Sequence, residues 1–414
     1  MKKEQNVPVL RFQGFSDGWD KKYLKNLVVL ERGGSPRPIN DYITTDDNGL
    51  NWVKIGDAPV NGNYITHTAE KIRPEGLSKT RQVFPGDLIL SNSMSFGKPY
   101  IMGIPGCIHD GWLLIRDDEH HFDLKYLCVL LGVPSMLRQY RALAAGSTVS
   151  NLNKELVGNT QVHIPDIVEQ KEIGVFFDKL DQAIYLCENK IKKLQQFRQA
   201  MMTKLFPREG AAEPELRFRG FSGEWKCCRF GDIADIRRGL TYSPSNLRKS
   251  GIRVLRASNI QDDTFYIGED DVFVEPDAVN IPMVKNGDIL IAAAGGSTRL
   301  VGKHAVIYGI EENSAVHGGF MLLASSDYPE FINALMGANW YRHFLQQFIA
   351  GGNGAIGNLN KSDLEEQIVF VPDVAEMEQI GNFFKKLDTY ISLQQKKLER
   401  MQRLKAALLE KLFV

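Results

Sequence analysis

The chain has 414 residues, of which 43% are apolar and 24% charged, close to the globular average, so wholesale disorder is not expected. No apolar run approaches the roughly 20 residues of a membrane-spanning helix, and the first residues lead into no apolar signal segment, which favours a cytoplasmic protein. Fifty acidic and fifty basic residues cancel, which argues against a uniformly basic nucleic-acid coat but allows local basic loops.

The start of the chain is repeated about 206 residues later. Residues 10–16 read Leu-Arg-Phe-Gln-Gly-Phe-Ser, and residues 216–222 read Leu-Arg-Phe-Arg-Gly-Phe-Ser, an offset of 216 − 10 = 206. Trp19 and Trp225 follow at the same distance in the two copies. Two similar copies in order predict two similar domains, which suits the reading of a target in two separated pieces.

Each copy contains short apolar segments that we expect to be buried strands, because Gly and Pro bound them. These segments are 51–55, 87–90 and 111–115 in the first copy, matched by 252–255, 288–291 and 319–323 in the second. The match pairs Gly111-Trp112 with Gly319-Phe320. Helical stretches are expected at 123–145 and 329–350, and a shared Asn-Leu-Asn-Lys follows at 151–154 and 358–361. Each copy is therefore expected to form a mixed α/β domain.

Polar, Gly-rich loops after the strands are the candidate DNA contacts, because short polar side chains on a rigid strand end suit base edges and phosphates. Lysines of the shared Asn-Leu-Asn-Lys suit phosphates. An ordinary solvated turn is the alternative interpretation for each residue. The candidates are Arg37, Ser91, Asn92, Ser93, Ser95, Lys98 and Lys154 in the first copy, and Arg238, Thr241, Tyr242, Ser297, Thr298, Arg299, Lys303 and Lys361 in the second.

A long helix is expected to end each copy. Asp166 with Glu169, and Asp373 with Glu376, spell a capping box at the start of each helix. Apolar residues then recur at alternating steps of four and three, which predicts a coiled-coil seam on which the two helices pair. The seam residues are Ile173, Phe177, Leu180, Ile184, Ile191 and Leu194 in the first helix, and Ile380, Phe384, Leu387, Ile391, Leu398 and Met401 in the second.

Three polar residues, Arg198, Gln394 and Lys405, interrupt this seam. A seam is by itself consistent with ordinary core packing. Roughly 40 helical residues at about 1.5 Å each give a rod of about 60 Å, longer than a compact core needs, which favours a spacer.

No catalytic or metal-binding motif is complete. The Gly-x-Gly-x-x-Gly at 352–357 follows a helix instead of a strand, and the P-loop-like 296–304 has one residue too many and His304 where Ser or Thr should bind magnesium. Five cysteines without a Cys-x-x-Cys pair indicate buried free thiols, with Cys227 and Cys228 adjacent. We therefore predict no enzyme activity, no metal and no cofactor.

The repeated Leu-Arg-Phe-x-Gly-Phe-Ser with its Trp, the Gly-Asp turn before the middle strand, and Ile-Pro-Asp-x-x-Glu-Gln at the first helix resemble the specificity subunit of Type I restriction-modification enzymes. The resemblance covers essentially the whole chain, and Met377 departs from it where the first copy has Gln170. It implies target-recognition domains at 1–165 and 207–371, held apart by antiparallel spacer helices at 166–206 and 372–414.

The same resemblance implies a non-enzymatic subunit that recognises a bipartite, asymmetric site on double-stranded DNA, one half-site per domain. It also implies docking of two methyltransferase subunits and, through them, of restriction subunits. The alternative from another class is a scaffold whose paired helices oligomerise and whose domains bind proteins or glycans. Salt separates the two, because a DNA reader with several phosphate contacts loses affinity steeply as salt rises.

Overall fold

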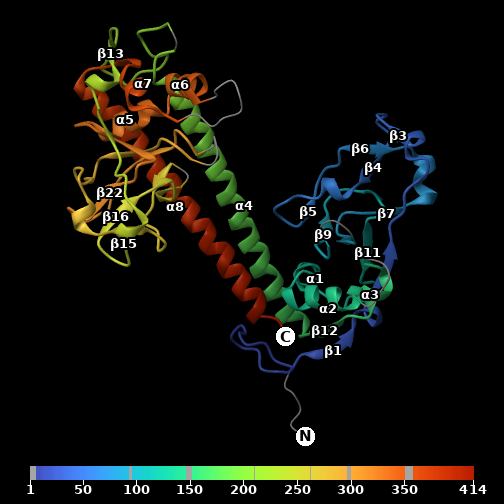
Figure 1. Cartoon of the computed structure of the whole chain (residues 1–414). Helices are drawn as coiled ribbons and strands as arrows, with labels where there is room; N and C mark the ends of the chain where they lie inside the picture. The colour runs from blue at the N-terminus through green and yellow to red at the C-terminus, as the bar shows by residue number, and fades with distance from the viewer. Residues whose placement is uncertain are drawn as a thin grey trace. The chain divides into compact units, whose positions relative to one another are not determined.

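The computed structural model describes residues 6–92, 96–145, 152–208, 210–261, 263–295, 300–349 and 358–414. Contacts divide the chain into two units, each treated by itself below: unit 1 is Met1–Lys190 with Gln394–Val414, and unit 2 is Ile191–Leu393. Both are mixed α/β, as the sequence predicted (Figure 1). Among the described residues, none of the helices combines the length and the apolar character that crossing a membrane requires.

The described residues of unit 1 form two five-stranded sheets and a two-stranded one. The central sheet has the order β2 (Val29–Arg32), β11 (Trp112–Arg116), β8 (Leu88–Ser91), β9 (Pro99–Met102) and β5 (Tyr64–Ile65). The second has β3 (Ile43–Thr44), β6 (Glu70–Ile72), β4 (Leu50–Val53), β10 (Gly106–Ile108) and β7 (Arg81–Val83), and β1 (Asp20–Tyr23) pairs with β12 (Gln161–Ile164). The helices are α1 (Leu124–Leu131), α2 (Pro134–Ala145) and α3 (Lys154–Gly158).

Unit 2 repeats this plan in its described residues. Its central sheet has the order β14 (Asp235–Arg238), β23 (Met321–Ser325), β20 (Ile289–Ala292) and β21 (His304–Val306), and a second sheet has β15 (Leu247–Arg248), β19 (Val272–Val274), β16 (Ile252–Leu255) and β22 (Ala315–His317). Two further pairs are β13 (Lys226–Arg229) with β24 (Ile368–Val371), and β17 (Ile260–Gln261) with β18 (Thr264–Phe265). The helices are α5 (Pro329–Met336), α6 (Asn339–Ile349) and α7 (Lys361–Glu365).

The six expected strands are present, but two details of the sequence prediction are wrong. Each expected helical stretch is two helices, because Gly132 and Gly337 end α1 and α5. The pairing of the last strands was also shifted by one residue. Trp112 lies opposite Ser91 and Met321 lies opposite Ala292, so Trp112 corresponds to Met321, and Gly111 corresponds to Phe320.

The two long helices are α4 (Ile167–Lys204) and α8 (Val374–Lys411), each of 38 residues. Half of the predicted capping box is present, because the Oδ1 atoms of Asp166 and Asp373 accept the backbone N–H groups of Glu169 and Glu376 at 3.0 and 2.9 Å. The glutamate side chains do not complete the box. They bond instead to arginines from the start of each copy.

These arginines give the repeated Leu-Arg-Phe a structural role. Both carboxylate oxygens of Glu169 accept from Arg11, at 2.8 and 2.7 Å, and those of Glu376 accept from Arg217 at the same two distances. The hydrogen bond to Glu169 raises the pKa of Arg11 above its ordinary value. Because both glutamates are buried, each ion pair fixes an N-terminal segment to the first turn of a long helix.

Each unit also contains the end of the long helix that began in the other copy. In unit 1 the N–H of Leu10 donates to the carbonyl of Lys411 at 2.9 Å, and the Phe413 ring packs edge-on against Trp19, where the red end of α8 meets the blue start of the chain (Figure 1). In unit 2 the N–H of Leu216 donates to Lys204 at 2.9 Å. Within each unit, one long helix therefore begins where the other ends.

The expected seam residues are buried or half-buried. Of the three polar residues that interrupt the seam, two form ionic contacts with the other helix. Lys405 Nζ lies 2.5 Å from Asp181 Oδ1 in unit 1, and Arg198 Nε lies 2.5 Å from Asp388 Oδ1 in unit 2. At the third, the thiol of Cys187 donates to the carbonyl of Gln394 at 3.6 Å. These contacts make the helices antiparallel in each unit and give their pairing a defined register.

Candidate nucleic-acid interface

The candidate loops meet at one edge of the central sheet in each unit. Because β2 and β8 are both antiparallel to β11, the last residues of β2 and β8 lie beside the first residues of β11. The strands β14, β20 and β23 repeat this arrangement in unit 2. We call the described residues among 32–38, 91–98 and 109–111 edge 1, and those among 238–244, 293–303 and 318–320 edge 2.

The two edges share one backbone framework. The N–H of Asn92 donates to the carbonyl of Gly111 at 2.9 Å, as the N–H of Ala293 donates to Phe320 at 2.9 Å. The turn before each last strand closes in the same way, from Trp112 to His109 at 3.1 Å and from Met321 to Gly318 at 2.8 Å. The residues of the two edges can therefore be compared position by position.

The glycine that follows β2 or β14 allows the backbone there to lie close to the turn before the last strand of the sheet. A Cβ atom on Gly33 would lie 2.2 Å from the carbonyl oxygen of His109, and one on Gly239 would lie 1.9 Å from that of Gly318. No side chain fits at such distances. Gly33 and Gly239 therefore occupy equivalent places in the two edges.

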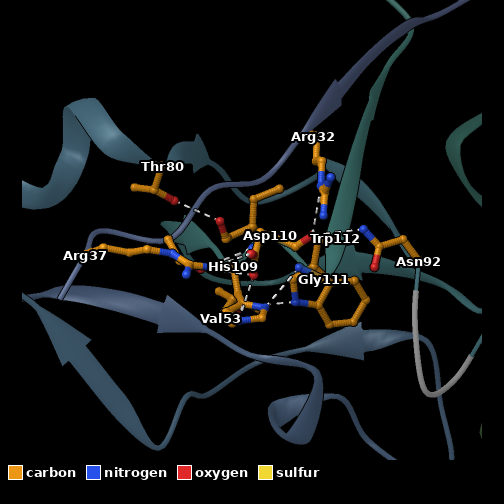
Figure 2. A network of polar contacts seen from close by, with 11 residues as sticks. Arg32, Arg37, Val53, Thr80, Asn92, His109, Asp110, Gly111 and Trp112 are labelled. Atoms are coloured by element: carbon orange, nitrogen blue, oxygen red, sulfur yellow. Dashed lines mark hydrogen bonds and ion pairs between the residues drawn. The ribbon is translucent and has the colours of Figure 1, made fainter. Parts of the chain in front are cut away.

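Asp110 is the centre of edge 1 (Figure 2). Its carboxylate accepts from the hydroxyl of Ser35 at 3.0 Å and lies 2.8 Å from His109 Nε2 and 3.8 Å from the guanidinium of Arg37. Its backbone carbonyl accepts from Arg32 Nε at 3.2 Å and from Asn92 Nδ2 at 2.9 Å. The partly exposed carboxylate and imidazole thus stand among cations, which suits the reading of polar base edges.

A hollow of about 1060 Å³ opens beside Asp110, lined among others by Ser35, Arg37, Lys54, Glu70 and His109. Its wall carries both signs of charge. Sequence analysis included Arg37 but missed His109 and Asp110, because a lone His-Asp pair in a short turn carries no motif. The only available signal was its place immediately before an apolar strand.

The other candidates of edge 1 differ in how they are presented. The residues Ser91 and Asn92 are 0% and 1% exposed and are bonded within the protein, so the structure gives them a supporting role instead of a place on the surface. Lys98 Nζ donates to the carbonyl of Val60 at 2.8 Å, and burial lowers its pKa. Lys154 is exposed at the start of α3. The candidates Ser93 and Ser95 lie outside the described residues.

On edge 2, Arg238 is the last residue of β14 and is exposed. In the segment that follows β14, Thr241 is exposed and Tyr242 is half-buried. Lys303 is half-buried. Lys361, at the start of α7, forms an ion pair with Glu365 at 3.4 Å. The candidates Ser297, Thr298 and Arg299, and the Gly-rich stretch 352–357, lie outside the described residues.

Two residues of unit 2 were not singled out by sequence analysis. Phe320 is 76% exposed on edge 2, at the position of Gly111, and Gly319 replaces Asp110. His317, at the position of Ile108, is buried, and this burial lowers its pKa to about 4. The two edges therefore carry different chemistry on the same backbone.

In the part of the chain that the structure describes, no three His, Cys, Asp or Glu side chains are grouped so as to hold a metal ion. The free thiols of Cys107, Cys128 and Cys187 are buried, as expected, but Cys227 is exposed and Cys228 is only partly covered. The expectation of burial was wrong for Cys227, because β13 pairs with β24 in a two-stranded sheet, where three of the four β13 residues are exposed.

Comparison with known proteins gives consistent matches along the chain. The profile described as the Type I restriction modification DNA specificity domain matches twice, at residues 16–196 and 222–403. The Type I restriction enzyme EcoKI specificity subunit of Escherichia coli (strain K12) is 23% identical over 424 residues, which cover 96% of this chain and 89% of that protein. The MjaVIII specificity subunit of Methanocaldococcus jannaschii is 20% identical over 336 residues, covering 77% and 76%.

A solved structure has a similar fold. The S subunit of a Type I restriction-modification system from M. genitalium covers 99% of both chains, with a TM-score of 0.64 and 16% sequence identity. At this identity the likeness concerns the fold, which includes both units and both long helices.

Proposed function

Because the chain belongs to the Type I restriction-modification DNA specificity family, we propose that it recognises a bipartite, asymmetric site on double-stranded DNA, with one half-site read by each unit. It docks methyltransferase subunits and, through them, restriction subunits, and is not itself an enzyme. Its place of action is the cytoplasm. The observation that carries the proposal is the repeated edge: one backbone framework occurs twice and bears different side chains each time.

The chemistry of each edge supports a different half-site. Asp110 can accept from the amino group of a cytosine, with Arg37 nearby for a phosphate or a guanine. On edge 2, Arg238 and Thr241 offer donors for guanine or phosphate oxygens. Lys154 and Lys361, which begin corresponding short helices, are proposed as phosphate contacts independent of sequence.

A site selection tests this proposal. The full chain, assembled with its methyltransferase partner, is used to select from randomised duplex DNA at two salt concentrations. The selected sites should contain two specified blocks, and affinity should fall at least tenfold between 50 and 200 mM salt if several phosphates are contacted. Asp110→Ala should relax one block by about tenfold in discrimination, and Arg238→Ala should relax the other.

Two outcomes would contradict the proposal. Affinity that does not respond to salt would favour the protein-binding or glycan-binding scaffold. Equal damage to both blocks by either substitution would show that the two units do not read separate half-sites. Lys249→Ala, at an exposed position of unit 2 outside edge 2, serves as the control for a general loss of positive charge.

We also propose that the paired helices set the number of unspecified base pairs between the half-sites. The support is the 38-residue length of each helix and the antiparallel ionic pairing within each unit. Seven residues inserted after Glu188 and after Gln395 would lengthen both helices at facing positions while keeping the seam in phase, since Cys187 contacts Gln394. The added 10 Å or so should widen the preferred gap by about three base pairs.

The same selection measures this effect. Both blocks should keep their sequences while the gap changes. An unchanged gap in a variant that still binds would exclude the helices as spacers. Insertion in α4 alone is the control, because it puts the seam out of register and should weaken binding without producing a new preferred gap.

A further inference from the structure

Phe320 is the most exposed large apolar side chain among the described residues of edge 2. It is 76% exposed, in the turn between β22 and β23. Its carbonyl accepts the N–H groups of Ala293 and Ala294 at 2.9 and 3.1 Å, so its backbone is fixed beside the loop that follows β20. A rigid backbone presents the ring at little cost in conformational entropy, which favours binding.

The framework itself does not require this ring. In unit 1, Gly111 occupies the equivalent position and accepts the N–H of Asn92 in the same way. The ring therefore serves something other than the fold of the turn. Isolated exposed apolar residues are common on protein surfaces, so exposure alone does not assign a role to Phe320, and its place on edge 2 decides.

Polar groups of edge 2 lie next to the turn that carries Phe320. A Cβ atom on the preceding Gly319 would lie 3.3 Å from the hydroxyl of Thr241, which places that hydroxyl next to the turn. Arg238, two residues before Leu240, is exposed at the end of β14. The carbonyl of Leu240 lies 3.3 Å from the same Cβ position. The turn that carries Phe320 thus lies next to Thr241, one of the groups proposed to contact bases or phosphates.

We propose that Phe320 contacts the C5-methyl group of a thymine, and that the half-site read by unit 2 therefore specifies an A·T pair at the position facing it. This inference rests on the proposed function. A phenyl ring neither donates nor accepts a conventional hydrogen bond, and the only apolar group that base pairs display in the major groove is the thymine methyl. Gly111 lacks a side chain, so the half-site of unit 1 receives no equivalent contact.

Deoxyuridine provides the test, because it differs from thymidine only by this methyl group. Each thymine of the selected half-site of unit 2 is replaced singly, and binding is measured with the full chain in complex with its methyltransferase partner. One replacement should weaken wild-type binding about fourfold, as expected for one methyl group no longer buried. Phe320→Ala should bind the two duplexes equally, and Phe320→Leu should keep part of the difference.

Tyr266→Ala is the matched control, since Tyr266 is an aromatic residue 47% exposed that follows β18, away from edge 2 in the sequence. It should retain the full sensitivity to deoxyuridine. Replacements in the half-site of unit 1 should have the same effect with and without Phe320.

The inference is overturned if the half-site of unit 2 contains no thymine, or if no replacement depends on Phe320. A second outcome that overturns it uses the fluorescence of 2-aminopurine placed in that half-site. If the fluorescence increases on binding and Phe320→Ala abolishes the increase, the Phe320 ring inserts between base pairs instead of contacting a methyl group. Loss of the thymine contact alone leaves selective bipartite binding intact. If the wild type selects no bipartite site at all, the proposed function fails and the inference with it.

Discussion

Units 1 and 2 have the same backbone at their edges but different side chains there. Edge 1 holds Asp110 in a network with His109 and Arg37 (Figure 2) and with Ser35, whereas edge 2 has an exposed Phe320, and the nearby His317 is buried. The backbone is fixed by glycines and by main-chain hydrogen bonds, which do not involve these side chains. The framework and the recognition chemistry are therefore carried by separate residues, so one can change while the other is kept.

A second difference lies where each long helix begins. The Gln170 amide donates to the carbonyls of His121 and Pro165, both at 3.1 Å, and accepts the N–H of Asp123 at 3.0 Å. Met377 takes the equivalent place in unit 2 and packs into its core. A fully bonded amide and an apolar side chain thus fill the same buried position, because neither leaves a polar group without a partner.

The largest expected effect concerns a feature that the units share. Arg11→Ala and Arg217→Ala would each leave a buried glutamate without its guanidinium, and each should lower the free energy of unfolding by about 3–5 kcal/mol. Urea titration of the full chain measures the loss. Similar losses would confirm one clamp used twice, whereas a change below about 1 kcal/mol in one variant would show that the two copies differ there.

A matched double variant sharpens this test. Arg11→Met with Glu169→Leu removes both charges and keeps apolar volume, so it should be more stable than Arg11→Ala alone. If the double variant were the less stable of the two, the cost would come from lost packing rather than from the unpaired carboxylate.

The sequence predicted most of the architecture because its signals are local and occur twice. Alternating steps of four and three predict α4 and α8, and Asp166 and Asp373 mark their first turns correctly. The failure at Glu169 has a clear cause. Its partner Arg11 is 158 residues away, and no local pattern indicates that a distant arginine will compete with the backbone for the carboxylate.

The candidate site was only partly predictable for the same reason. The candidates were chosen because they are polar residues that follow strands. This criterion cannot distinguish the exposed Arg238 from the buried Asn92, whose amide donates to the carbonyl of Asp110 and stabilises the turn there. Phe320 was assigned to a strand, because Gly318-Gly319 offers two possible matches for Gly111. Only the cross-strand pairing of Met321 with Ala292 decides between them.

A smaller expected effect is a pH dependence of folding stability that His317 gives to unit 2 and that unit 1 lacks at the equivalent position. In unit 2 burial lowers the pKa of His317 to about 4. The equivalent residue of unit 1 is Ile108, whose side chain cannot bind a proton. In the unfolded chain the histidine has its ordinary pKa of about 6.5, so between these values the unfolded state binds more protons than the folded one. The stability contributed by the neutral His317 is therefore complete above about pH 6.5 and is lost as pH falls toward about 4.

Between pH 7 and pH 5 this loss amounts to about 2 kcal/mol from His317 alone. The variant His317→Ile, patterned on Ile108 of unit 1, should lose that part of the pH dependence while keeping the part due to all other groups. Urea titrations of both proteins at the two pH values give the difference directly. The substitution also removes the hydrogen bond between Nε2 of His317 and the carbonyl of Arg237, at 3.2 Å, and so changes stability at pH 7 as well. The decisive quantity is therefore the change between the two pH values. Equal changes in wild type and variant would show that His317 is protonated as readily in the folded chain as in the unfolded one.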